Sequence, residues 1–240
     1  MSDFPEVELI FVSGVLDQSI WKHQEKYFSR NCSVETVGGG RFSEVRQDLL
    51  EILNTSENAV VIGAELGNLI AQSVEEHENV ISTVITGPLD RRPVLGEKSF
   101  KAWSKILQHP KFVKKVFFSK SSDYDIVKQA SLLLDNVDFE SYRSFIGKNL
   151  RVPLKNSLII YNQECRFSSM NGVEDLKSNS QIALLDAGSF SFYEKPQEYN
   201  KALHDYLLGK KDLLEKRELV KAASENRSLK DFEDKLGLNK

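Results

Sequence analysis

The sequence predicts an open, doubly wound α/β domain with a mostly parallel sheet of about six strands. Two observations predict this fold class. Short runs rich in Val, Ile and Leu recur along the chain with weak alternation, which is typical of strands buried on both faces. Helical patterns separate most of these runs, and strands that alternate with helices indicate a parallel sheet with right-handed crossovers. The expected strands are residues 7–12, 33–37, 59–62, 81–86, 157–161 and 181–185.

Apolar residues at helical spacing predict the connecting helices. They cover residues 18–30, 43–53 and 66–77, and a further helix, 197–208, follows the last strand. The alternation breaks once, between Pro88 and Pro153, where four helical segments occur without a convincing strand. An insertion after the fourth strand is expected over the carboxyl ends of the strands, where α/β sheets bind ligands. The four segments are residues 99–108, 112–118, 123–134 and 139–148.

These patterns predict three parts. Residues 1–88 and 153–208 form the α/β core, residues 89–152 form a helical cap, and residues 209–240 form a charged, helical C-terminal extension. The extension has two open interpretations, because a helical pattern does not distinguish them. It is an extra helix packed on the surface, or a docking element for a partner protein.

Composition excludes several classes of function. The 240 residues are 40% hydrophobic and 28% charged with a net charge of −3, so we expect a globular chain without general affinity for nucleic acid. Neither a secretory signal nor a run near the ~20 apolar residues of a membrane span is visible. Cys32 and Cys165 do not make a disulfide framework, which predicts free thiols and a cytoplasmic location. The four histidines lack metal-ligand spacing, so no metal or other cofactor is expected. Basic doublets such as Lys114-Lys115 are interpreted as solvated surface.

One local motif carries the most information. Gly63-Ala64-Glu65-Leu66-Gly67 follows an apolar run and opens a helical stretch. A strand, a sharp glycine-flanked turn and a helix form the setting of the nucleophile elbow, G-x-S-x-G. Here the central residue is a glutamate.

Three further segments have similar meaning. Residues 9–14 end in Ser13-Gly14 and resemble the strand and His-Gly that precede an oxyanion loop; residues 38–43 resemble a Gly-x-Gly-x-Ser loop. Residues 187–200 resemble a closing Gly-His followed by Glu-x-Pro-x-x-Tyr-Asn. In this order, residues 8–208 resemble the α/β-hydrolase superfamily. The triple glycine 38–40 has no following Lys-Ser/Thr pair, which favours a tight turn over a phosphate loop.

The resemblance implies a site in which each expected triad residue is replaced. The nucleophile, acid and histidine positions fall at Glu65, Cys165 and Ser189, and Glu164 could replace the acid after a shift of one residue. Backbone N–H groups of Leu66 and of residues 14–15 would form an oxyanion hole, in which an ionised Glu65 would occupy the substrate's place. The resemblance implies the following ligand-binding residues: Ser13, Gly14, Val15, Glu65, Leu66, Ser189 and Phe190.

Two functions are therefore carried forward. The first is a pseudo-hydrolase, a non-catalytic module that binds a protein partner through the cap or the C-terminal extension, or an apolar small molecule beside the aromatic residues 190–193. The alternative is a hydrolase or lyase with a rebuilt site that uses Glu65 in place of the elbow serine. Glu65 would act either as the nucleophile or, held protonated by an apolar pocket, as a general acid together with Cys165 or Ser189. Cys165 is either a reactive thiol or a small buried replacement for the acid.

Overall fold

The structure is a computed structural model that describes residues 5–87, 97–107, 109–134, 137, 139–148, 157–165 and 180–210. It divides into two units, residues 6–203 and residues 1–5 with 204–240. In the second unit, the Lys210 ammonium lies 4.4 Å from the centre of the Tyr206 ring. Almost all of the predicted C-terminal extension lies outside the described residues. No helix in the described part of the chain is long and apolar enough to cross a membrane.

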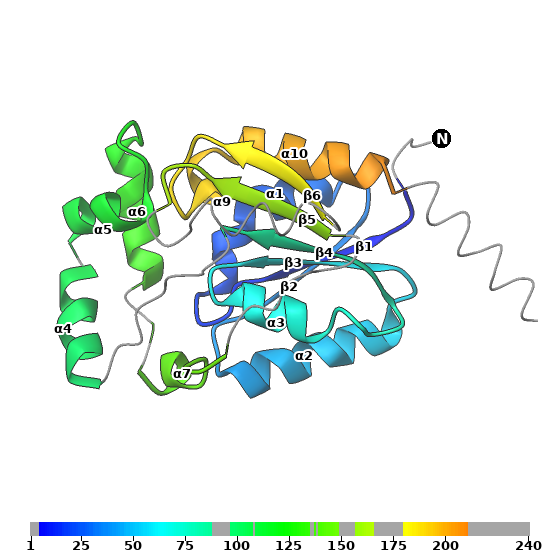
Figure 1. Ribbon diagram of the computed structural model, residues 1–240, viewed down its shortest axis with the longest axis horizontal. Coiled ribbons are helices and arrows are strands. Elements are labelled where there is room, and N and C mark those ends of the chain that lie inside the picture. The colour runs from blue at the N-terminus through cyan, green and yellow to red at the C-terminus, as the bar shows by residue number, and fades with distance from the viewer. Residues whose placement is uncertain are drawn as a thin grey trace, which may run out of the picture. The chain divides into compact units, whose positions relative to one another are not determined.

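The larger unit contains a six-stranded sheet with the strand order β2-β1-β3-β4-β5-β6 (Figure 1). Every pairing described between its strands is parallel, which confirms the predicted fold class. The predicted strands are also confirmed, with shifts of at most two residues at their ends. The strands are β1 (Glu8–Val12), β2 (Ser33–Val37), β3 (Ala59–Ala64), β4 (Val80–Thr86), β5 (Ser157–Asn162) and β6 (Ser180–Leu185).

Helices cover both faces of this sheet. Successive β1 side chains point to opposite sides, so their contacts show how each face is covered. Ile10 and Val12 belong to the core cluster that α2 and α3 complete. On the other face, the ring of Phe11 packs 5.0 Å from that of Trp21 and 6.3 Å from that of Phe28. Figure 1 shows α2 and α3 on one side of the sheet and α1 on the other. These helices are η1 (Gln18–Trp21), α1 (Lys22–Phe28), α2 (Phe42–Thr55), α3 (Gly67–Ser73), α9 (Ser191–Glu194) and α10 (Pro196–Leu208).

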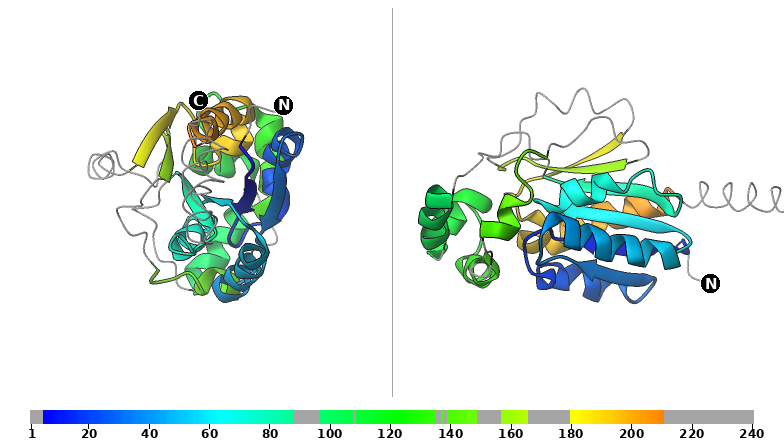
Figure 2. Two further views of the ribbon diagram at one scale, coloured as in Figure 1. Left: turned by 90° about the vertical axis from the view of Figure 1, so that its right-hand side faces the viewer. Right: turned by 90° about the horizontal axis from the view of Figure 1, so that it is seen from below.

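The described part of the segment between β4 and β5 is largely helical, as predicted. The strand arrowheads point toward the side on which α4, α5 and α6 lie (Figures 1 and 2). The turn after α7 also packs on the core, since the Phe42 N–H donates to Ser144 Oγ at 2.8 Å and Phe145 is buried in the α2 cluster. The inserted helices are α4 (Glu97–Leu107), α5 (Pro110–Phe117), α6 (Tyr124–Leu134) and α7 (Phe139–Arg143).

Candidate functional site

The turn between β3 and α3 has the geometry of an elbow. Among the described non-glycine residues, Glu65 alone has a positive φ, of 53°. A left-handed backbone costs an L-residue roughly 1–2 kcal/mol, so the fold must hold this turn in place. Glu65 is almost completely buried, with 4% of the residue exposed. The glutamate predicted at the elbow therefore occupies a strained and enclosed position at the carboxyl end of β3.

Close backbone packing explains the glycines around this turn. A Cβ on Gly67 would lie 2.0 Å from the Val12 carbonyl oxygen, and a Cβ on Gly14 would lie 2.7 Å from the Gly67 nitrogen. These approaches leave no space for a side chain. The start of α3 and the loop after β1 are thus in direct contact. The sequence assigned the two halves of an oxyanion hole to these two segments, through Leu66 and residues 14–15.

A buried polar chain fixes the elbow to the neighbouring strand. Asn68 Nδ2 donates to the Thr86 carbonyl at 2.8 Å, and the Thr86 N–H donates to Asn68 Oδ1 at 3.1 Å. The Thr86 hydroxyl lies 2.7 Å from the Tyr199 hydroxyl. Burial raises the pKa of Tyr199 well above its ordinary value, although the Thr86 hydrogen bond opposes this effect. Sequence reasoning gave Asn68 and Thr86 no role and included Tyr199 only in the closing pattern of residues 187–200. The signal available was a single asparagine in the first turn of a buried helix.

The predicted acid and histidine positions lie side by side. Cys165 Sγ and Ser189 Oγ are 3.0 Å apart, and both side chains are buried. Asn162, at the end of β5, holds this arrangement. Its carbonyl accepts the Cys165 N–H at 3.1 Å and its side chain donates to the Ser189 carbonyl at 3.3 Å. The loops after β5 and β6 therefore bring together two residues that are 24 positions apart in the sequence.

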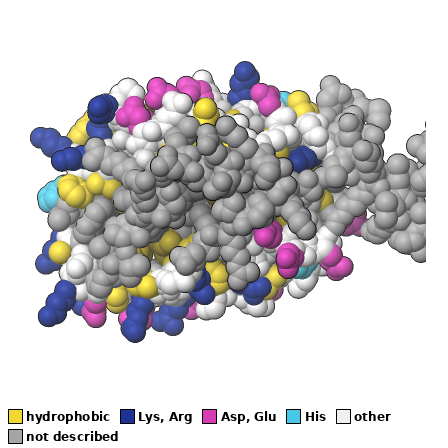
Figure 3. Space-filling view, viewed as in Figure 1, with side chains coloured by type: hydrophobic (Ala, Val, Ile, Leu, Met, Phe, Trp, Pro, Cys, Tyr) yellow, Lys and Arg dark blue, Asp and Glu magenta, His cyan; other side chains and the backbone are white. Residues whose placement is uncertain are grey.

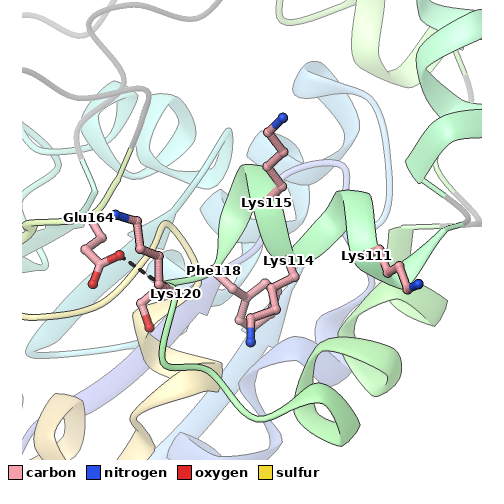
Figure 4. A pocket seen from close by; sticks show the side chains of 7 residues that line it. Lys111, Lys114, Lys115, Phe118, Lys120 and Glu164 are labelled. Atoms are coloured by element: carbon pink, nitrogen blue, oxygen red, sulfur yellow. Dashed lines mark hydrogen bonds between the residues drawn. The ribbon is translucent and has the colours of Figure 1, made fainter.

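Glu164 faces the helical insertion. Its carboxylate accepts the backbone N–H of Lys120 at 3.1 Å, as the dashed line in Figure 4 marks. Its own N–H donates to the Ala187 carbonyl. The carboxylate that could replace the missing acid is therefore directed to the turn after α5, while the neighbouring Cys165 is directed to Ser189.

Two predicted ligand-binding side chains have structural partners. The buried Ser13 hydroxyl donates to the Leu16 carbonyl at 2.7 Å. Phe190 is 2% exposed and stacks on Phe117 with 5.2 Å between ring centres. Phe192 likewise packs 4.5 Å from Trp21. Loop packing, one of the two interpretations of the aromatic run 190–193, thus describes these rings.

The four histidines lie in four separate parts of the chain. His23 lies on α1, edge-on to the Tyr193 ring, and burial followed by the charges of two neighbouring lysines lowers its pKa. His77 precedes β4, at the amino ends of the strands and so opposite the elbow. His109 is the N-cap residue of α5, and His204 Nδ1 lies 3.6 Å from the Asp205 carboxylate. In the described part of the chain, no group of three or more His, Cys, Asp or Glu could hold a metal ion.

Glu194 is a second buried carboxylate that sequence reasoning did not single out. It accepts the N–H and hydroxyl of Ser119, the Ser122 hydroxyl at 2.6 Å and the Gly188 N–H at 3.0 Å. One side chain thus joins the turn between α5 and α6 to the loop that carries Ser189. The available signal was the Glu-x-Pro pattern, which marked the helix start without revealing the partners of the carboxylate.

Comparison with known proteins identifies the fold. Neither protein-family models nor curated protein sequences gave a significant match. The comparison with solved structures gave many significant matches. The chain is similar to the enol-lactonase from Burkholderia xenovorans LB400, with a TM-score of 0.65, 16% identity and coverage of 84% of this chain and 91% of that one. It is also similar to a thermophilic esterase from Thermogutta terrifontis, with a TM-score of 0.66, 13% identity and coverage of 85% and 90%.

A carboxylesterase from Bacillus subtilis gives the same result, with a TM-score of 0.62, 12% identity and coverage of 85% and 84%. All three identities are low, so the likeness concerns the fold. The protein has the α/β-hydrolase fold, as the sequence motifs predicted, and fold alone does not carry an activity.

Proposed function

We propose that this protein is a non-catalytic α/β-hydrolase-fold protein, which binds a small molecule in its cleft or a protein partner on its surface. The observation that supports the proposal is the pairing of Cys165 with Ser189, whose polar atoms are 3.0 Å apart. In the predicted triad these positions hold the acid and the histidine that receives the nucleophile's proton. A thiol beside a hydroxyl lacks the imidazole that accepts a proton near neutral pH.

The elbow residue supports the same proposal. A carboxylate cannot be activated as a serine is, and a buried acid at this turn occupies space that an acyl substrate would need. Loss of triad members lowers the rate by on the order of 10⁴ to 10⁶, which leaves at most binding and weak polarisation of a carbonyl group.

The direct test is an activity screen. Full-length protein is incubated with the p-nitrophenyl esters of acetate, propionate and butyrate, and separately with a serine-directed fluorophosphonate. We expect rates equal to those of buffer and no labelled serine, for both the native protein and Glu65→Gln. Ester turnover that Glu65→Gln abolishes would contradict the proposal.

A second test asks whether Glu65 blocks the cleft. Glu65→Ala removes the carboxylate and frees any backbone donors around the elbow. Added butyrate should then raise the melting temperature of the variant more than that of the native protein, because a ligand that binds the folded state stabilises it. The uncharged butyramide serves as the matched control ligand. An equal effect of butyrate on both proteins would show that Glu65 does not occupy an anion site.

The second candidate function is an enzyme with a rebuilt site centred on Glu65. It is favoured by the positive φ of this residue, since backbone strain concentrates at functional positions. The solved structures of similar fold include esterases and a lactonase. A raised pKa of Glu65, measured by carbon NMR of the labelled side chain, would support this candidate as a general acid. A depressed pKa would support the blocked cleft.

The triple variant Glu65→Ser, Cys165→Asp and Ser189→His tests the scaffold itself. The two loop positions already lie within hydrogen-bonding distance of each other, so the new aspartate and histidine should pair. Ester turnover above buffer is expected if the rest of the cleft is intact. A folded but inactive triple variant would argue that more than the triad has been lost.

A further inference from the structure

The helical insertion differs in charge from the rest of the chain. Residues 89–152 contain 13 lysines and arginines and 7 aspartates and glutamates, in a chain with a net charge of −3. Figure 3 shows lysine and arginine side chains gathered on the left, where Figure 1 shows α4, α5 and α6. A local positive surface attracts acidic ligands even when the whole protein is acidic.

A pocket of about 510 Å³ lies in this basic region (Figure 4). Its lining comes from α5, from the turn that follows α5 and from the loop after β5. Among the described lining residues, Phe118 supplies an apolar part of the wall and Glu164 is the one acidic residue. The other charged residues in this described lining are four lysines, Lys111, Lys114, Lys115 and Lys120.

Two carboxylates accept hydrogen bonds from the turn that carries Lys120. Glu164 accepts the Lys120 N–H, and Glu194 accepts the N–H and hydroxyl of Ser119. The acidic lining residue is thus already engaged with the backbone. A support that is fixed before binding lowers the ordering cost that a ligand must overcome.

The partners of these lysines within the described part of the protein are few. Lys114 Nζ donates to the Ser122 carbonyl at 2.6 Å, a neutral partner. Within the described residues, no carboxylate forms an ion pair with Lys111, Lys115 or Lys120. A ligand with several negative charges would therefore not have to displace an internal partner.

The direction of the side chains indicates the kind of ligand. In Figure 4 the amino groups of Lys111, Lys115 and Lys120 point to different sides of the pocket. A single phosphate is bound by donors that converge on one point. Ammonium groups spread around a partly apolar wall match instead a chain that carries several carboxylates at intervals.

We propose that this pocket is a docking site for an acidic peptide segment of a partner protein. The inference rests on the partner-binding part of the proposed function and names its surface and chemistry. Carboxylates of the segment pair with the exposed lysines at the rim. A nucleic acid fits less well, because Phe118 is buried and offers no exposed ring face for base stacking.

The test measures binding of fluorescein-labelled octaglutamate to the full chain by fluorescence anisotropy. Low ionic strength is used, since salt screens exposed charges. The pocket variant combines Lys111→Glu with Lys115→Glu. The control combines Lys98→Glu with Lys128→Glu, which changes the charge equally at exposed positions on α4 and α6 outside the pocket. We expect the pocket variant to bind about tenfold more weakly and the control to change by less than about twofold.

Three outcomes would overturn the proposal. The first is that the native protein does not bind octaglutamate. The second is that both double variants lose the same affinity for octaglutamate, which would indicate a general effect of charge. The third is tighter binding of inorganic pyrophosphate, an oligothymidylate of equal length or phosphatidylserine vesicles that depends on Lys111 and Lys115. Because no turnover is measured, failure here leaves the proposal for the Glu65 cleft unaffected.

Discussion

Glu194 should be among the most sensitive positions in this fold. This residue is 8% exposed, and its carboxylate accepts hydrogen bonds from two backbone N–H groups and two hydroxyls. After Glu194→Ala the hydroxyls of Ser119 and Ser122 can rotate toward each other, since their oxygens are 3.0 Å apart. The backbone N–H groups of Ser119 and Gly188 cannot rotate to a new partner in this way. Each buried donor left unsatisfied costs about 1–3 kcal/mol, so the variant should lose roughly 3 kcal/mol of unfolding free energy.

This loss has a thermal and a local consequence. For a domain of this size, 3 kcal/mol lowers the melting temperature by roughly 6–12 °C. Hydrogen exchange should also accelerate at residues 117–122 and 186–190, the two segments that the carboxylate joins. The measurements are urea unfolding followed by tryptophan fluorescence, and exchange followed by mass spectrometry.

Glu198→Ala is the matched control. The Glu198 side chain is 58% exposed and forms an ion pair of 3.8 Å with Lys195, an arrangement that contributes between zero and about 1 kcal/mol. If Glu194→Ala were no more destabilising than Glu198→Ala, or left exchange at residues 117–122 unchanged, the hydrogen bonds assigned to this carboxylate would be incorrect.

Three further predictions concern the core and one thiol. Gly67→Ala should cost about 1–3 kcal/mol of unfolding free energy, measured in urea, because the new Cβ has no space. Gly147→Ala should cost less, because its Cβ meets nothing within 4 Å and only the strain of its positive φ remains. The reverse order would refute the contact between α3 and the loop after β1. Tyr199→Phe should cost about 1–2 kcal/mol by leaving the Thr86 hydroxyl without its 2.7 Å partner, and a neutral effect would contradict that bond. Burial raises the pKa of the Cys32 thiol to about 11. Its alkylation by iodoacetamide, followed by peptide mass spectrometry, should therefore remain slow at pH 8 and accelerate as the pH rises toward 11. An alkylation rate that already levels off just above the ordinary pKa of about 8.5 would indicate an exposed thiol.

Local sequence patterns were sufficient for the architecture. Apolar runs and helical spacing predicted all six strands, the parallel sheet and the inserted helices, because a buried strand and an amphipathic helix each leave a periodic pattern in adjacent residues. The glycines around Glu65 predicted the sharp turn, because a close approach of two backbone segments leaves no space for a side chain. The sequence by itself therefore determined the fold, and it assigned Glu65, Cys165 and Ser189 to the places where the relay of an active hydrolase would stand.

Tertiary structure alone decided which side chains meet. Cys165 contacts Ser189, while its neighbour Glu164 turns to Lys120 of the insertion, and no local pattern distinguishes these two directions. Asn68 and Glu194 likewise find partners that are distant in sequence. The physical reason is that hydrogen-bond partners at the carboxyl edge of a parallel sheet come from loops whose relative positions depend on the packing of the whole core. Periodicity specifies each strand and helix, but long-range packing specifies the polar contacts between their ends.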